Sequence, residues 1–461
     1  MKLSLAFIFA AIATAYAIPV SKDEIKTKSA QGLRLLRLAE GADPIWVTER
    51  EMLQLAKERV GFFDVTDYYD PEADTSKESG DVEIFAYPSG PTRQTTVNPI
   101  ISGLAVSNLQ TYLNKFTSFN NRYYNSDTGK QASDWLFDTI TSIIASSPST
   151  GATVQRFSHS WTQSSIIARF PGRQNGPITV LGAHLDSINH SSSNPSTARA
   201  PGADDDGSGS ISILEAFRGL AASGFQPLNP VEFQWYSAEE VGERGSGAIA
   251  ASYKISDLVL QGTQELKIFV HSVRPGSTEI IGLIQDYTSS TLNTYTTALA
   301  KEYNDIPVGS AGSCGYACSD HASYNANGYP STFPFEATFA NQSPVIHTAN
   351  DTTSASGFSW THMLEYSKLA VAFAVELESL MNKKADQLVA LSVYRNAVER
   401  HIAALSKSSD ERMNHHPRHQ AWKWAGTQGN EFPKAVTLEV IKSPDFRHPE
   451  NSEYAKGNPP M

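Results

Sequence analysis

Between residues 95 and 382 the chain alternates between short apolar runs and longer segments with helical periodicity. The apolar runs suit buried strands, and they cover residues 178–181, 231–236, 266–270 and 279–284. The helical spacing covers residues 106–119, 132–145, 210–220 and 360–380. Strands that alternate with helices form a sheet covered on both faces, with binding loops at the carboxyl ends of the strands. The pattern therefore predicts an α/β fold with a mixed, mostly parallel central sheet flanked by helices.

The composition is that of a globular protein with a sizeable core. Of the 461 residues, 40 % are hydrophobic and 18 % are charged, which excludes a fully disordered chain and a fibrous repeat protein. The 48 acidic and 37 basic residues give a net charge of −11. An acidic chain without a dense Lys/Arg stripe repels phosphate groups. We therefore expect neither nucleic acid nor a membrane surface as a partner, and a monomer is the default expectation.

The first 17 residues have the features of a cleaved secretory signal. Lys2 precedes an apolar run over residues 3–12, which is too short to cross a bilayer, and the small-residue site Ala15-Tyr16-Ala17 follows. The alternative is an N-terminal core helix. Secretion implies an oxidising compartment, in which the only two cysteines, Cys314 and Cys318, are free to pair. A zinc site is the weaker interpretation, because a structural site needs four ligands.

Residues 18–87 are expected to form a pro-region. The segment is polar and rich in charge, shows helical periodicity over residues 51–59, and ends at the turn-forming sequence Pro88-Ser-Gly-Pro91. Such a segment after a secretory signal is typical of a zymogen, and a small subdomain that is retained is the alternative. The main domain is then expected over residues 88–382.

The C-terminal extension, residues 383–461, is polar and irregular apart from one expected helix over residues 385–405. It contains five of the twelve histidines, namely His401, His415, His416, His419 and His448. These could bind metal, but solvated histidines in a peripheral tail are the simpler interpretation. The role of this extension is not predicted.

Two of the four motifs that carry chemistry follow the apolar run at residues 178–181. His184 and Asp186 lie two apart on an extended segment, so their side chains point the same way, and the carboxylate can orient a metal-binding imidazole. A satisfied histidine at a strand end would look the same. About twenty residues later, Asp204-Asp205-Asp206 precedes a helix. A divalent cation is the simplest compensation for three crowded carboxylates, although a solvated acidic turn is common, and calcium is a rival without EF-hand spacing.

The other two motifs add further ligands and a base. Glu239-Glu240 follows the strand-like run at residues 231–236, where one glutamate can bind metal while the other accepts a proton from water. His347 lies in a loop context, in Val345-Ile-His347-Thr-Ala-Asn-Asp351. Two histidines and several carboxylates at strand ends of one sheet together predict hydrolytic zinc chemistry.

These motifs, with Cys314-Gly-Tyr316-Ala-Cys318-Ser-Asp-His321 between the third and the fourth, resemble the secreted fungal leucine aminopeptidases. The catalytic domain of that family is shared with bacterial co-catalytic zinc aminopeptidases. The resemblance covers roughly residues 20–380. It implies a zinc exopeptidase architecture of the phosphorylase/hydrolase-like kind, two Zn²⁺ ions per chain, extracellular localisation, and peptide substrates with a free and preferably apolar N-terminal residue.

The resemblance also implies roles for individual residues. The implied metal ligands are His184, Asp205, Glu240 and His347. Asp205 is the carboxylate that bridges the two ions, and its bond to Asp206 resembles the non-proline cis peptide of the family. Glu239 resembles the general base, Asp186 the partner of His184, and Tyr316 the group that steadies the oxyanion. Cys314 and Cys318 resemble the family's loop disulfide.

One expected ligand is missing from the sequence. The family pattern has a fifth metal ligand, an aspartate, at the end of the strand after the Glu-Glu motif, and its position falls near Lys267. No aspartate stands there, and the alternatives nearby are Asp257, Glu265 and His271. Residues 254–272 lose the resemblance while nearly keeping their length, as a gene-model error or a true divergence would produce. Loss of this ligand is expected to weaken one zinc site.

Two other functions remain open alongside the zinc aminopeptidase. A catalytically impaired homologue that acts as a binding protein would bind less zinc and show no turnover. A one-zinc relative such as a glutaminyl cyclase shares the fold and needs fewer ligands, but the Glu-Glu and Asp-Asp-Asp motifs match the aminopeptidases better.

Of the three glycosylation sequons, Asn189 is the best candidate, because Asn341 precedes Ser343-Pro344 and Asn350 lies close to His347.

Overall fold

The structure is a computed structural model, and it describes residues 20–39, 42–58, 60–69, 87–255, 263–267 and 277–379. The expected signal at 1–17, the C-terminal extension at 383–461 with its helix at 385–405, and the residues Asp257 and His271 lie outside the described residues. Among the helices that are described, none combines the length and the apolar character that crossing a bilayer requires.

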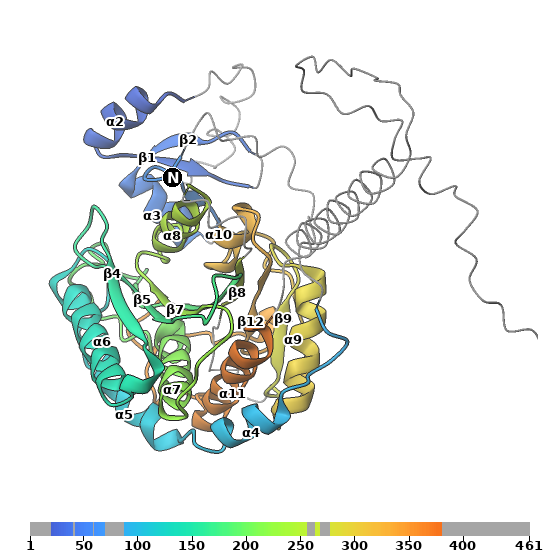
Figure 1. Cartoon of the computed structure of the whole chain (residues 1–461). Coiled ribbons are helices and arrows are strands. Elements are labelled where there is room, and N and C mark those ends of the chain that lie inside the picture. Colours follow the sequence, from blue (N-terminus) through green and yellow to red (C-terminus); the bar gives the residue numbers. More distant parts are fainter. Residues whose placement is uncertain are drawn as a thin grey trace, which may run out of the picture. The chain divides into compact units, whose positions relative to one another are not determined.

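The predicted central sheet is present, and it has six strands in the order β11-β8-β6-β7-β5-β4 (Figure 1). Its strands are β4 (Thr153–Phe157), β5 (Ser165–Phe170), β6 (Ile178–His184), β7 (Val231–Tyr236), β8 (Thr263–Lys267) and β11 (Ser331–Thr332). The pairs β11/β8, β8/β6 and β6/β7 are parallel, whereas β7/β5 and β5/β4 are antiparallel. The sheet is therefore mixed and mostly parallel, as predicted.

The sequence pattern was less accurate at the edges. The run at residues 279–284 does not join the central sheet: β9 (Ile281–Ile284) forms a second sheet of three strands with β10 (Val308–Gly312) and β12 (Pro334–Phe335). The antiparallel strands β4 and β5 were not predicted. Residues of β4 are exposed or half-buried, so this strand lacks the continuous apolar run by which the buried strands were found.

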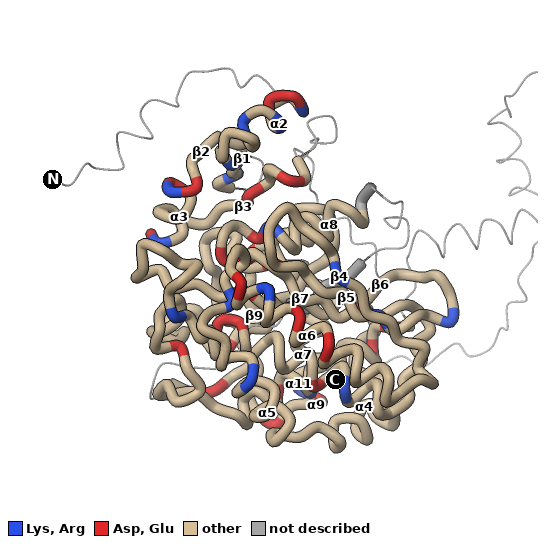
Figure 2. The backbone as a smooth tube through the Cα atoms, turned by 90° about the vertical axis from the view of Figure 1, so that its left-hand side faces the viewer, with Lys and Arg blue, Asp and Glu red and all other residues tan. Residues whose placement is uncertain are grey.

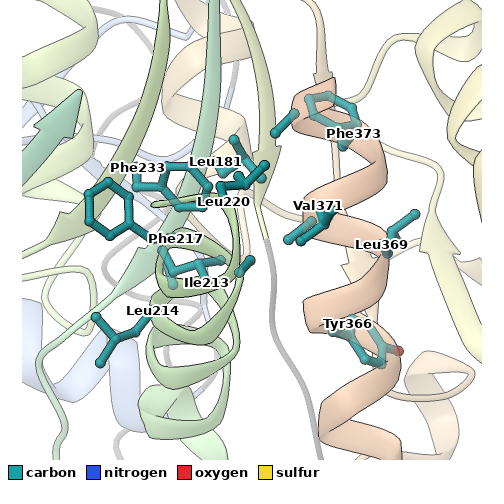
Figure 3. Packing of buried hydrophobic residues seen from close by; sticks show 14 of the residues in the cluster. Leu181, Ile213, Leu214, Phe217, Leu220, Phe233, Tyr366, Leu369, Val371 and Phe373 are labelled. Atoms are coloured by element: carbon teal, nitrogen blue, oxygen red, sulfur yellow. The ribbon is translucent and has the colours of Figure 1, made fainter. Parts of the chain in front are cut away.

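The two faces of the central sheet bury different helices, because neighbouring residues of a strand point to opposite faces. Leu181 and Trp235 face the larger core, which contains α7 and α11, whereas Val180 and Tyr236 face a smaller cluster with α8 and α10. Figure 3 shows side chains of α7 and α11 in the larger core beside residues of β6 and β7. The helices are α4 (Gln94–Ile101), α5 (Val106–Phe116), α6 (Asp127–Ala145), α7 (Gly209–Ala222), α8 (Arg244–Ile255), α9 (Ser290–Tyr303), α10 (His321–Ala326) and α11 (Trp360–Leu377).

The predicted pro-region contains a small folded unit. Its strands β1 (Leu33–Arg37), β2 (Ile45–Thr48) and β3 (Phe63–Asp64) form an antiparallel sheet in the order β2-β1-β3. The unit also contains α2 (Lys22–Ala30) and α3 (Glu49–Lys57), and Figure 2 shows basic and acidic residues next to one another along both helices. A capping box between Thr48 and Glu51 starts α3, because each side chain accepts the backbone N–H of the other residue.

This unit packs on the main domain through two apolar clusters. Leu36, Met52 and Phe62 pack with residues of the main domain that include Tyr123 and Val241. A second cluster joins Leu35, Phe63 and Val65 to Ala317 and Ala322.

Candidate active site

The first predicted ligand, His184, is the last residue of β6 and is fully buried. Its Nδ1 lies 3.6 Å from Oδ1 of Asp186 and 3.3 Å from the Asp186 carbonyl oxygen. The Asp186 carboxylate also accepts the backbone N–H groups of Glu239 (3.1 Å) and Glu240 (3.2 Å). Asp186 therefore orients the imidazole and fixes the Glu-Glu turn relative to β6, as expected of a residue that supports a metal ligand.

Asp205 lies between the two histidines, in the kinked turn Ala203–Ser208 that leads into α7. Its Oδ1 is 3.0 Å from Nε2 of His184, and its Oδ2 is 2.7 Å from Nε2 of His347. The Asp205–Asp206 peptide bond is cis, in agreement with the resemblance. A carboxylate that presents one oxygen to each imidazole has the arrangement that a bridge between two metal ions requires.

The two glutamates follow β7 and have different surroundings. Glu240 is buried; its Oε1 accepts the backbone N–H of Ile188 (3.1 Å), and its Oε2 lies 3.1 Å from Nε2 of His347. Glu239 is more exposed, and its Oε2 lies 3.8 Å from Nε2 of His184. The preceding Ala238 has a φ of 62°, which turns the chain sharply enough to present both carboxylates at the strand end.

His347 also has a positive φ, 58°, which is uncommon for residues other than glycine. Its imidazole faces Asp205 and Glu240 from a loop rather than from a strand. Asp351, four residues further along this loop, connects it to the turn that carries Asp205. The Asp351 carboxylate accepts the backbone N–H groups of Asp204 (2.9 Å) and Asp205 (3.1 Å).

The crowding and burial of these groups shift their pKa values. Burial and the Asp205 charge raise the pKa of Glu240 to about 7. Burial also raises the pKa of Glu239. Burial alone would raise the pKa of Asp205 too, but the facing His347 and His184 hold it well below its usual range. Buried carboxylates that face one another are stabilised by a cation, so the site is suited to a divalent metal.

The donor set fits zinc. Ligand atoms of His184, Asp205 and Glu240 lie within 4.8 Å of one another, and so do those of His190, Glu240 and His347. Imidazole nitrogens combined with carboxylate oxygens are typical zinc ligands. The two groups share Glu240, and Asp205 contacts a histidine of each. The four predicted ligands are thus brought together, with His190 as an addition that the sequence analysis did not include.

Tyr316 belongs to a loop closed by a disulfide between Cys314 and Cys318, which confirms the predicted pairing. The Asp286 carboxylate anchors this loop by accepting the backbone N–H groups of Cys314 (3.0 Å) and Gly315 (2.7 Å). Tyr316 lines one cavity together with Glu239, Glu240 and His347. The loop therefore places Tyr316 in the same cavity as two of the predicted ligands, Glu240 and His347.

Two further segments, both of which contribute apolar residues, complete this cavity. One is apolar and contributes Phe333, Phe335, Phe339 and Ile346. The other comes from the predicted pro-region and contributes Ala56, Val60, Gly61 and Phe62. The backbone at Gly61 packs so closely on the Tyr316 ring that a Cβ at this position would clash with it.

Two further positions from the sequence analysis, Asn189 and Lys267, are not among the clustered ligand atoms of the described residues. The Asn189 side chain is buried; its Nδ2 donates to the Arg199 carbonyl oxygen (2.8 Å) and its Oδ1 accepts the Ser191 N–H (2.9 Å). Lys267 pairs with Gly182, two residues before His184 in the neighbouring strand. Residues 268–276, where a ligand level with His184 would fall, are outside the described part of the chain.

Sequence reasoning missed three residues that shape the site. Asp351 was noted within the fourth motif but given no role, and Asp286 was not considered. His190 was seen only as part of the Asn189 sequon, although a histidine six residues after His184 was a signal that could have been used.

Comparisons with known proteins agree with this geometry. The model of Peptidase family M28 matches residues 165–374. "Leucine aminopeptidase 1" of Emericella nidulans is 40 % identical over 393 residues, covering 82 % of this chain and 99 % of that relative. A "Probable leucine aminopeptidase" of Arthroderma benhamiae is 38 % identical over 392 residues, with the same shares covered.

Solved structures give the same result. The LapA aminopeptidase of Legionella pneumophila superposes with a TM-score of 0.64 at 28 % identity, covering 76 % of this chain and 94 % of that one. LapB of the same organism has a TM-score of 0.64 at 24 % identity, covering 77 % and 98 %, which is a likeness of fold.

A helix-covered mixed sheet, with histidines and carboxylates gathered from a strand end and the adjoining loops, is typical of a metal-dependent hydrolase. The sequence relationships specify the class further. The chain belongs to Peptidase family M28, and it is a zinc-dependent aminopeptidase.

Proposed function

We propose that this chain is a secreted aminopeptidase that binds two zinc ions and removes apolar, leucine-type residues from the N-terminus of peptides. The observation that carries the proposal is the placement of Asp205, whose two carboxylate oxygens face His184 and His347 in one buried cluster. This arrangement suits a pair of metal positions with a shared ligand.

His184, Asp205, Glu240 and His347 would hold zinc, which would supply the Lewis-acid chemistry for activating water and polarising a peptide carbonyl group. Glu239 is the general base in this proposal. Its carboxylate lies beside the ligands and lines the cavity, so it can accept a proton from water and return it to the leaving amine. Asp186 holds His184 in place, and the Tyr316 hydroxyl donates a hydrogen bond to the oxyanion.

The cavity supports the proposed substrate class. Phe333, Phe335, Phe339 and Ile346 give it an apolar wall, which suits a leucine-type side chain. The carboxylates at its other side attract the positively charged N-terminus of a peptide. The relatives from Emericella nidulans and Arthroderma benhamiae carry names that specify leucine.

The domain assignments complete the proposal. Residues 1–17 act as a secretory signal, residues 18–87 as a pro-region that keeps the enzyme a zymogen, and residues 88–382 as the catalytic domain. The placement of Val60, Gly61 and Phe62 in the cavity supports the zymogen. We keep the monomer as the expected state, with neither nucleic acid nor a membrane as partner. Asn189 remains the proposed glycosylation site.

The proposal predicts two zinc ions per mature chain and turnover of a leucyl anilide. Metal content is measured by mass spectrometry on secreted protein freed of residues 18–87, and turnover before and after removal of metal with a chelator. N-acetylleucyl anilide is the matched control, because it lacks the free amine and should not be cleaved. A leucyl anilide rate that survives complete loss of zinc would contradict the proposal. Less than one zinc ion with no turnover would instead favour the impaired homologue.

A further inference from the structure

His190 lies on the loop that follows β6, six residues beyond His184. Its backbone N–H donates to the carbonyl oxygen of His347 (3.1 Å), so this loop is tied directly to the loop that carries His347. This hydrogen bond fixes the position of the His190 backbone, from which the side chain extends. The backbone of His190 is thereby held next to that of His347, a predicted metal ligand that is distant in the sequence.

The His190 side chain is half-buried and lines the same cavity as Asp205, Glu240 and His347. The ring centroids of His190 and His347 are 4.5 Å apart, and the rings are tilted by 54°. Ligand atoms of His190, Glu240 and His347 all lie within 4.8 Å of one another. Two imidazole nitrogens and a carboxylate oxygen this close can be brought onto one zinc ion by small side-chain movements, because Zn–N and Zn–O bonds are about 2.0–2.2 Å long.

The donors that the structure describes are therefore unequal on the two sides of Asp205. On one side, His347 and His190 supply two imidazoles beside Glu240. On the other side, His184 is the single imidazole, and its grouping is completed by the carboxylates of Asp205 and Glu240. Among the described residues, the position on the His347 side therefore has one imidazole more than the position on the His184 side.

We infer that His190 is a metal ligand of this chain, adding a second imidazole to the position formed by His347, Glu240 and Asp205. The inference rests on the proposed function, since it concerns the same metal centre. It concerns the zinc position on the His347 side.

The test compares the full-length secreted chain with two variants of nearly equal shape, His190→Gln and His190→Glu. Glutamine fills the space of the imidazole but is a poor zinc ligand, whereas glutamate restores a ligating atom. Zinc affinity is measured by competition with a chromophoric chelator, and bound zinc by mass spectrometry. His347→Gln serves as the reference for loss of a predicted ligand, and the thermal unfolding midpoints of the metal-free proteins report any effect on the fold.

Loss of a residue that merely supports a ligand typically costs 10–100-fold in metal affinity, so His190→Gln should weaken zinc binding by at least about tenfold at the position that His347→Gln also weakens. His190→Glu should regain most of that affinity, while the metal-free unfolding midpoints stay equal. Unchanged zinc affinity in His190→Gln would overturn the inference, and so would equal losses in the Gln and Glu variants. If the wild-type chain binds no zinc at all, the proposed function itself fails.

Discussion

Replacing Glu239 by Gln is expected to lower kcat by about 10²–10⁴ while the zinc content stays that of the wild type. The amide has the shape of the carboxylate but cannot accept a proton from water, so a general base is lost. Glu239 belongs to neither group of clustered ligand atoms that the described residues form, and its closest approach to His184 is 3.8 Å. Metal binding should therefore tolerate the substitution.

The matched control is Glu243→Gln, four residues further along the same segment. Glu243 lines the same cavity as Glu239, and its carboxylate accepts the Ser323 hydroxyl (3.1 Å), a hydrogen bond that glutamine can keep. We expect a much smaller loss of kcat in this control. If Glu239→Gln lost zinc together with activity, Glu239 would be a ligand rather than a base. Wild-type kcat in Glu239→Gln would exclude both roles.

The sequence predicted the parts of the fold whose pattern is local. The strand at residues 231–236 was predicted with the bounds of β7, because both of its faces are buried and its run of residues stands out. The strand β4 was missed, because its residues are exposed or half-buried and carry no such run. Partner choice is likewise not local, so the pattern at residues 279–284 indicated a strand but did not reveal that β9 pairs outside the central sheet.

The candidate site shows the same division. His184, Asp205, Glu240 and His347 were identified because they stand in motifs whose order resembles a known family, and the structure brings all four together. His190, six residues after His184, and Asp351, at the end of the fourth motif, were given no role. Their relevance depends on contacts made only in the folded chain, such as the hydrogen bond from His190 N–H to the His347 carbonyl oxygen.

The uncut chain that retains residues 18–87 is expected to show at most about 1 % of the activity of the cut enzyme. Residues 60–62 form part of the cavity wall, and the Asp64 N–H donates to the Gly242 carbonyl oxygen (3.0 Å) directly after the Glu-Glu turn. Substrate can enter only when this unit moves away, so apparent activity falls in proportion to the open fraction. Opening must break the contacts of two apolar clusters and of buried ion pairs, so it costs free energy. An opening free energy of about 3 kcal/mol is enough to keep the open fraction below 1 %.

A substitution of Asp67 tests more specifically whether the contact between the pro-region and the main domain inhibits the enzyme. Asp67 pairs with Arg34 of the pro-region (2.7 Å) and with Arg244 of α8 (2.9 Å), so it links the two parts electrostatically. The two arginines hold the pKa of Asp67 below its usual value despite partial burial, so the pairs persist at neutral pH. Asp67→Asn should raise the activity of the uncut chain at least fivefold, because the lost ion pairs no longer hold the pro-region on the main domain. An exposed ion pair contributes ~1 kcal/mol to stability and breaking a buried one costs about 3–5 kcal/mol, and these partly buried pairs lie between the two.

Asp23→Asn is the control, because Asp23 is an exposed residue of α2 and its substitution changes the net charge of the pro-region by the same amount. Activity on leucyl anilide is measured for each uncut chain and again after removal of residues 18–87. Once cut, both variants should match the wild type, since neither substitution remains in the enzyme. If the uncut wild-type chain were as active as the cut one, the segment would be a retained subdomain rather than an inhibitory pro-region. Equal activation by Asp67→Asn and Asp23→Asn would show that net charge, and not the link to Arg244, controls the release.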